Sequence, residues 1–337
     1  MIRNAISKLA DRKDLSEEEA GESIKEILEG KATSSQIAAF LMGLRVKGEK
    51  IPEILGSAKA MREKALTLKV NAEMAVDTCG TGGDRANTFN ISTTTAFVVA
   101  GAGVPVAKHG NRAVSSLCGS ADLLKELGVN IDLSPDKVAR CIDEIGIGFL
   151  FAPLFHTAMQ FAAGPRKEIG IRTIFNLLGP LVNPAEVKAQ ILGVYSRELT
   201  EPLAYVLERL GTKRAFVVCG SDGLDEVTIT GETAVSEVSN NEVKSYMLIP
   251  EDFGIRKSPA DELTGGDAFY NKEILIRILK GAKGGKRDIV LVNSSVALIA
   301  GGKAKNFKEG VKIAEESIDS GKAFKKLNAL IEFTNKK

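Results

Sequence analysis

The segment at residues 77–84, Asp-Thr-Cys-Gly-Thr-Gly-Gly-Asp, has the composition of an anion-binding loop. It follows an apolar run at 74–76 that predicts a strand, and it leads through Asn-Ile-Ser-Thr at 90–93 into a helical pattern at 96–102. Glycines allow backbone N–H groups to approach a phosphate closely, and a helix N-terminus adds partial positive charge. The spacing is that of neither a Walker A loop nor a G-x-G-x-x-G loop. The segment therefore predicts a phosphorylated ligand, bound differently from the two common nucleotide modes.

Three further polar clusters follow predicted strands. The loop at 108–116 (KHGNRAVSS) contains two fixed cations with amide and hydroxyl groups that can wrap a phosphate. The turn at 220–226 (GSDGLDE) offers adjacent carboxylates, which hold magnesium when substrate phosphates complete its shell. Arg166 can hold a carboxylate through two parallel hydrogen bonds. Taken singly, these clusters can also be explained as a solvated loop, an ordinary acidic turn and a surface arginine. Their shared position after strands favours one site.

The elements that must position these clusters alternate between strands and helices from residue 75 onward. Apolar runs predict strands at 75–78, 104–108, 148–152, 190–195, 215–219 and 289–292. Helical patterns lie between them at 121–127, 135–145, 198–210 and 272–279. A β-rich stretch at 227–248 predicts a hairpin or antiparallel edge, and the tail at 307–333 is helical in pattern. The fold class is therefore α/β, with a mostly parallel central sheet flanked by helices.

The first part of the chain shows only helical patterns. Capping boxes stand at 16–19 and 33–36, and Pro52 suits the first turn of a third helix. We predict a small N-terminal helical domain at 1–68, on which part of about 160–186 packs, and a large α/β domain at 75–337.

Composition excludes several function classes. The 337 residues are 44% hydrophobic and 26% charged, with a net charge of +2, so nothing indicates a general nucleic-acid or membrane-surface binder. Four widely spaced cysteines form no C-x-x-C pair, which argues against a zinc site or a disulfide framework. No segment resembles a signal peptide or a membrane span. A cytoplasmic location is expected.

Together the motifs resemble the anthranilate phosphoribosyltransferase family. The matching stretches are DTCGTGGD (77–84), NIST (90–93), KHGNRAVSS (108–116), FAPLFHTAM (151–159), RTIFNLLGPLVNP (172–184) and GLDE (223–226). Members resemble thymidine-type nucleoside phosphorylases in fold and are typically homodimers joined through their helical domains. The resemblance implies transfer of the phosphoribosyl group of phosphoribosyl pyrophosphate to the amine of anthranilate, in tryptophan biosynthesis.

The resemblance also implies roles for individual residues. Magnesium would be held by Ser92, Asp225 and Glu226. Anthranilate would meet Arg166 through its carboxylate, with Gly80, Asn111, His109 and His156 along its path. Phosphoribosyl pyrophosphate would lie on the two loops and the helix start between them, at Gly80, Gly82, Gly83, Asp84, Thr88, Asn90, Ser92, Thr93, Lys108, Arg112, Ser115, Ser116 and Ser120. The same substrate-binding stretches include Ile91, His109, Gly110, Asn111, Ala113 and Val114.

The implied chemistry demands few catalytic groups. The aromatic amine is mostly unprotonated at neutral pH and attacks as it stands, while the ribose C1 develops oxocarbenium character. The protein neutralises the leaving pyrophosphate and aligns the substrates. Lys108 and Arg166 are the catalytic candidates, with His109 as the acceptor if a proton is transferred, although lone histidines are more often structural.

Two alternatives remain at this point. A thymidine-type nucleoside phosphorylase leaves Arg166 and the pair Asp225 and Glu226 unexplained. A nucleic-acid-binding relative without transferase activity should carry excess basic charge, which a net charge of +2 does not provide.

Overall fold

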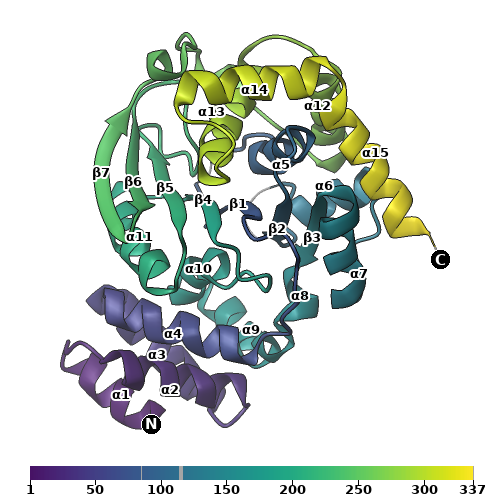
Figure 1. Ribbon diagram of the computed structural model, residues 1–337. Coiled ribbons are helices and arrows are strands. Elements are labelled where there is room, and N and C mark those ends of the chain that lie inside the picture. Colours follow the sequence, from purple (N-terminus) through teal and green to yellow (C-terminus); the bar gives the residue numbers. More distant parts are fainter. Residues whose placement is uncertain (85, 114–116, 337) are drawn as a thin grey trace.

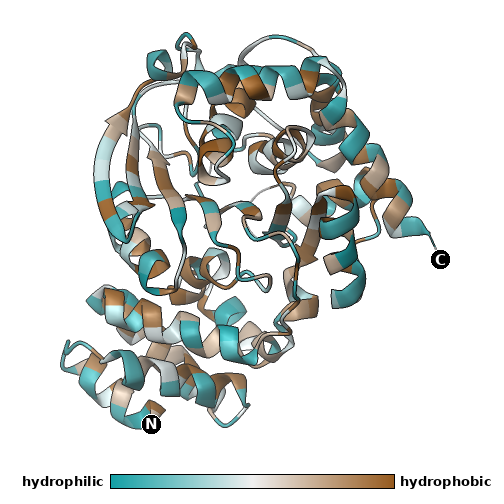
Figure 2. Ribbon diagram, viewed as in Figure 1, coloured by the Kyte–Doolittle hydropathy of each residue, from teal (hydrophilic) through white to brown (hydrophobic). Residues whose placement is uncertain are grey.

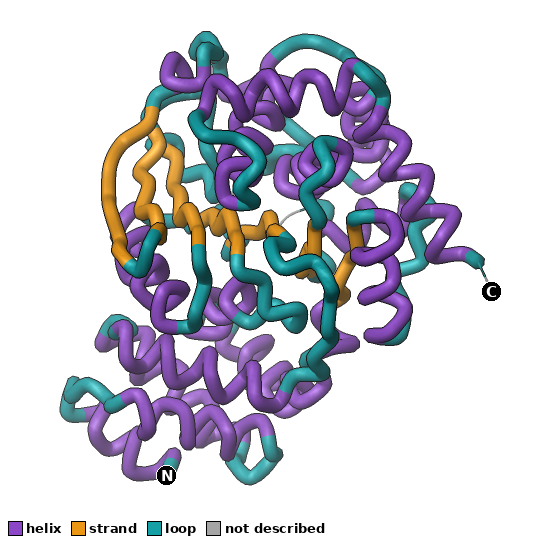
Figure 3. Tube along the Cα trace, viewed as in Figure 1, coloured by secondary structure: helices purple, strands orange, loops and turns teal. Residues whose placement is uncertain are grey.

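The computed structural model describes residues 1–84, 86–113 and 117–336. Within these ranges a central sheet of seven strands runs in the order β3-β2-β1-β4-β5-β6-β7 (Figures 1 and 3). The first five strands are parallel, and β6 and β7 are antiparallel, which confirms the mostly parallel sheet and the hairpin. The strands are β1 (Val76–Gly80), β2 (Val106–Gly110), β3 (Ile147–Phe151), β4 (Ala189–Gly193), β5 (Arg214–Gly220), β6 (Thr233–Ser239) and β7 (Glu242–Leu248).

One predicted strand is wrong. Residues 289–292 lie inside α13 (Gly285–Ala300), whose side chains from Ile289 onward are all buried. A helix that is apolar on every side has no 3.6-residue pattern of exposure, so a short window of it reads like a buried strand.

The helices around the sheet otherwise follow the sequence patterns with small shifts at their ends. The predicted helix at 135–145 is α7 followed by a π-helical turn at Cys141–Ile145. The helical tail is divided at Gly321, which has a φ of 75°. The helices of this part are α5 (Ile91–Gly101), α6 (Ser120–Glu126), α7 (Pro135–Arg140), α8 (Ala152–Phe155), α11 (Thr200–Arg209), α12 (Ala268–Leu279), α14 (Phe307–Asp319) and α15 (Lys322–Asn335).

Alternate residues of β5 face two separate apolar clusters, because side chains alternate across a strand. Phe216 and Val218 pack in the cluster that contains α5 and α13, whereas Ala215 and Val217 pack in the cluster that contains α11. Figure 2 shows apolar colour concentrated where the strands meet these helices. The sheet is therefore covered on both faces.

The N-terminal helices are α1 (Ile2–Ala10), α2 (Glu17–Leu28), α3 (Ser34–Lys47) and α4 (Ile51–Lys64), and they lie at one end of the molecule (Figure 1). Ser16 and Thr33 form the predicted capping boxes, and Pro52 lies in the first turn of α4. Two helices from far along the chain, α9 (Gln160–Ile169) and α10 (Ile174–Leu178), pack against α3.

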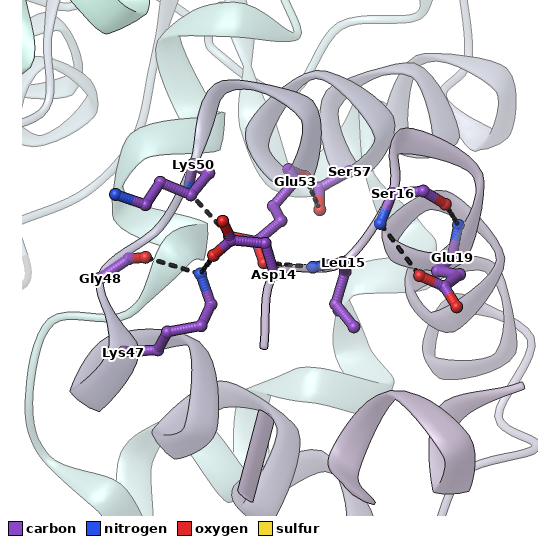
Figure 4. A network of polar contacts seen from close by, with 9 residues as sticks. All are labelled: Asp14, Leu15, Ser16, Glu19, Lys47, Gly48, Lys50, Glu53 and Ser57. Atoms are coloured by element: carbon purple, nitrogen blue, oxygen red, sulfur yellow. Dashed lines mark hydrogen bonds and ion pairs between the residues drawn. The ribbon is translucent and has the colours of Figure 1, made fainter. Parts of the chain in front are cut away.

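A buried carboxylate ties three of these N-terminal segments together (Figure 4). Glu53 is fully buried, and it accepts hydrogen bonds from the backbone of Leu15 at 2.9 Å and of Lys50 at 2.8 Å. Lys47 pairs with it at 3.0 Å. Because a buried charge is tolerated only when it is paired and hydrogen-bonded, this network fixes the C-terminal end of α3 against the N-terminal end of α4.

In the described ranges, no helix is long and apolar enough to cross a bilayer.

Candidate active site

The strand order reverses direction at β1, which has β2 on one side and β4 on the other. Ligands of open parallel sheets bind at such a switch point, outside the carboxyl ends of the strands. β1 ends at Gly80 and β4 at Gly193, and their carboxyl ends are in register. The loop at 81–84 therefore begins at the crevice where a ligand is expected.

Glycine at both strand ends makes room for Asp225. A Cβ on Gly193 would lie 1.5 Å from the carbonyl oxygen of Asp225, and a Cβ on Gly80 would lie 2.4 Å from its Oδ2. The N–H of Gly82 donates to the same Oδ2 at 2.8 Å. Gly82 and Gly83 have φ angles of 66° and 76°, in the left-handed region that favours glycine. The acidic turn and the glycine loop are thus one structural unit.

Lys108 lies beneath this unit and is 3% exposed. Its ammonium donates to the carbonyl oxygen of Thr78 on β1, and to Oγ of Ser92 at 3.3 Å in the first turn of α5. Burial lowers the pKa of Lys108, against the attraction of Asp77 and of the acids at 225 and 226. The lysine therefore joins β1 to the start of α5, within electrostatic range of both acids of the turn.

The acidic side chains of Asp225 and Glu226 have too little positive charge beside them to balance their own. Burial, and next the neighbouring Asp84, raise the pKa of Asp225 to about 8. Burial and then Asp225 raise the pKa of Glu226 far above its usual range. Among the described residues no three acidic, histidine or cysteine side chains are arranged to hold a metal by themselves. Oxygen donors of this kind suit magnesium when substrate phosphates supply further ligands.

The start of α5 uses several predicted contact residues for the protein's own hydrogen bonds. Asn90 donates to the carbonyl of Cys118 at 3.0 Å and accepts from Asn271 at 3.0 Å. Ile91 is buried, and the buried hydroxyl of Thr93 has no partner among the described residues. Thr88 forms an isolated bridge with Thr264. These side chains mainly hold the helix start in place, whereas the Ser92 hydroxyl contacts Lys108 at 3.3 Å.

The second predicted loop begins at Gly110, at the end of β2, and is organised by Asp122. This carboxylate accepts from the backbone of Ala113 at 2.9 Å and lies 3.5 Å from the guanidinium of Arg112. Two further predicted residues form local hydrogen bonds: the Asn111 side chain accepts from the next backbone N–H at 2.7 Å, and the Ser120 hydroxyl donates to the carbonyl of Asn111 at 3.2 Å. The predicted residues Val114, Ser115 and Ser116 lie outside the described ranges.

The two histidines come together although they are far apart in sequence. The ring centroids of His109 and His156 are 5.2 Å apart, and neither Nε2 has a hydrogen-bond partner in the described part of the chain. Burial, and next His156, lower the pKa of His109 to about 3, and burial lowers the pKa of His156 to about 4. Both rings are therefore neutral at physiological pH and offer an unused nitrogen to a ligand.

Arg166 lies on α9, with its guanidinium 5.2 Å from the ring centroid of Phe175. Burial lowers its pKa, and no described carboxylate forms an ion pair with it. Phe175, its aromatic neighbour, is not one of the predicted site residues. The arginine therefore presents a charge that a ligand carboxylate can neutralise.

Sequence reasoning missed the buried polar pair that aligns the strands below the site. Asp77 is fully buried, and it accepts from the backbone of His109 at 3.1 Å and from Asn183 at 2.8 Å. Asn183 also donates to the carbonyl of Ala107 at 2.8 Å. Burial raises the pKa of Asp77, which these hydrogen bonds oppose. An aspartate inside a predicted buried strand was the available signal.

Comparison with known families places this geometry in a class. The helical bundle domain of the glycosyl transferase family matches residues 3–65, and the a/b domain of that family matches residues 72–324. The class is thus a glycosyl transferase that combines a helical bundle with an α/β domain.

Comparison with individual proteins identifies the family within this class. Anthranilate phosphoribosyltransferase from Acetivibrio thermocellus is 57% identical over 335 residues, covering 99% of this chain and 97% of the relative. The crystal structure of the Thermus thermophilus enzyme aligns with a TM-score of 0.94 at 43% identity, covering 98% of this chain and 99% of that one. The Saccharomyces cerevisiae enzyme, solved in complex with PRPP and Mg, aligns with a TM-score of 0.90 at 31% identity, covering 99% and 97%. The chain belongs to the anthranilate phosphoribosyltransferase family, which confirms the resemblance seen in the motifs.

Proposed function

We propose that this protein transfers the phosphoribosyl group of phosphoribosyl pyrophosphate to the amine of anthranilate. The amine nitrogen forms a bond to C1 of the ribose, the C1–oxygen bond to pyrophosphate breaks, and the amine loses a proton. The observation that carries the proposal is the joining of the glycine loop, Lys108 and the acidic turn at the switch point of the sheet. A polyphosphate with a bound cation is the ligand whose charges complement that set.

The pyrophosphate is proposed to lie on the loop at Gly80–Asp84, with the second loop completing its enclosure. Backbone N–H groups of the loop and the charge of Lys108 would stabilise the negative charge that develops as the C1–oxygen bond breaks. Magnesium would be held by Asp225 and Glu226 with Ser92, and when bound it would neutralise the leaving group. The high pKa values of the two acids support this assignment, because a cation would replace the protons.

Anthranilate is proposed to be oriented by its carboxylate on Arg166 and by the neutral rings of His109 and His156. The unpartnered Nε2 atoms support hydrogen bonding to the substrate. A pKa of about 3 makes His109 a weak proton acceptor, so a binding role is favoured over general-base catalysis. The amine then attacks without prior deprotonation, and alignment supplies much of the rate enhancement.

The proposal is tested by mixing the protein with both substrates and magnesium and following the loss of anthranilate fluorescence. The double variant D225N/E226Q should lose magnesium-dependent turnover while it keeps its circular dichroism spectrum. Full activity of that variant would contradict the metal assignment. An inactive wild-type protein would favour a non-catalytic relative, whereas phosphorolysis of thymidine would favour the nucleoside phosphorylase.

We also propose a cytoplasmic homodimer joined through a helical domain at residues 1–68, with the α/β domain at 75–337. Val46 on α3 is 67% exposed and Phe161 on α9 is 44% exposed, which supports an apolar contact on these neighbouring helices. None of the four cysteines forms a disulfide, which suits a reducing compartment. Neither nucleic acid nor a membrane is expected as a partner. V46E should shift the protein from dimer to monomer in sedimentation velocity, and an unchanged dimer would contradict the proposed contact.

A further inference from the structure

Arg172 lies in the short connection between α9 and α10, which brings it from the helical side of the molecule to the glycine loop. α9 is followed by Gly170, which has a φ of 67°, and α10 is preceded by its N-cap residue Thr173, whose N–H donates to the side chain of Asn176 at 3.0 Å. The connection is therefore fixed at both ends within a few residues. The backbone that carries Arg172 therefore has a defined conformation.

The guanidinium of Arg172 touches the glycine loop. A Cβ on Gly83 would lie 2.9 Å from Nε and 3.0 Å from Nη2 of Arg172. On its other side the guanidinium stacks over the ring of Tyr195, 4.0 Å from the centroid, just beyond the end of β4. Stacking on an aromatic face orients a guanidinium while leaving its N–H groups free to bind. The guanidinium is thus held in place beside the loop that is proposed to bind pyrophosphate.

The charge of Arg172 is not neutralised within the described ranges. Two other arginines that lie over aromatic rings also pair with acids: Arg140 with Glu144 at 2.8 Å, and Arg214 with Glu237 at 3.1 Å. Arg172 forms no such ion pair with any described carboxylate, and it is half-buried. A half-buried cation in contact with an anion-binding loop matches a phosphate oxygen as its missing partner.

We propose that Arg172 is a further phosphate-binding residue of this site, which contacts the diphosphate of phosphoribosyl pyrophosphate across Gly83. The inference rests on the proposed function and extends it to a residue outside the two loops and the acidic turn. Arg166 lies six residues earlier on the adjoining helix α9, so this short stretch of the chain carries one arginine for each substrate. Loss of Arg172 should therefore weaken the binding of the diphosphate substrate and leave the binding of anthranilate unchanged.

The test compares R172Q, which removes the charge, with R172K, which keeps the charge but loses the planar fork. R140Q is the matched control, because Arg140 also stacks on an aromatic ring but lies on α7 at 65% exposure. Calorimetry with inorganic pyrophosphate and magnesium gives a readout that does not depend on turnover. Steady-state kinetics then separate the KM values of the two substrates.

For R172Q we expect pyrophosphate binding to weaken by about 10-fold or more, as for the loss of a charge-assisted hydrogen bond. The KM for phosphoribosyl pyrophosphate should rise similarly, the KM for anthranilate should stay within about 2-fold, and R172K should be intermediate. R140Q should match the wild type. If R172Q binds pyrophosphate as the wild type does while the wild type is active, the assignment of Arg172 is wrong and the proposed function stands. A wild-type protein that is inactive with both substrates overturns the proposed function and this assignment with it.

Discussion

The neutral histidine pair makes a quantitative prediction about stability and pH. In the unfolded chain a histidine has a pKa of about 6.5, whereas in the fold His109 and His156 have pKa values of about 3 and about 4. Below pH about 6.5 the unfolded chain binds protons that the folded protein does not. A depressed folded-state pKa therefore gives stability that is complete above that pH and is lost as the pH falls toward the folded values.

The size of the loss follows from linkage. Each histidine should lower the free energy of unfolding by about 1.4 kcal/mol per pH unit, so at about pH 5 it should contribute a loss of about 2 kcal/mol. Since the side chains are 6% and 8% exposed, little solvent screening reduces this value. The pair together should account for a loss of about 4 kcal/mol relative to about pH 7.5.

The assay is urea unfolding at about pH 7.5 and about pH 5, applied to the wild type and to the double variant H109Q/H156Q. Other groups titrate as well, including buried acids with raised pKa values, so only the difference between the two proteins is interpreted. The variant should lose about 4 kcal/mol less than the wild type on acidification, and each single variant about half of that. An equal loss in wild type and double variant would refute the reasoning that both rings are held neutral by burial.

Two further predictions concern residues that position the site and the helical domain. G193A should lower magnesium-dependent turnover by about 100-fold or more, because the new Cβ would lie 1.5 Å from the carbonyl oxygen of Asp225 and must displace the acidic turn. G164A, whose new Cβ would meet open space, should fold and melt like the wild type, and a fully active G193A would contradict the packing argument. E53A should lower the free energy of unfolding in urea by about 3 kcal/mol, because it removes the acceptor of the Leu15 and Lys50 N–H groups and one of the two carboxylates that pair with the buried Lys47. E22A, at a more exposed pair, should change it by less than about 1 kcal/mol, and equal effects of the two variants would contradict a special role of the buried network.

Much of the fold could be predicted from the sequence, because it depends on interactions between residues that are close together in the chain. The capping boxes at Ser16 and Thr33, the hairpin of β6 and β7, and the glycine loop each depend on residues close together in the chain. The helix α13 was misread because its outer face is covered by other helices, which is a property of packing and not of the local sequence. The organising roles of Asp77 and Asp122 were not predicted, because their partners come from other segments.

By itself the sequence determined the family, the alternation of strands and helices, and the kinds of group that the site contains, because motifs and periodicity are local. Only the tertiary structure decided how those groups meet. Asp225 reaches Gly82 across 143 residues of chain, the two histidines become one neutral pair, and Arg172 arrives at the glycine loop from the helical side. Burial and proximity, which set the pKa values and the unpaired charges, exist only after the distant segments have packed.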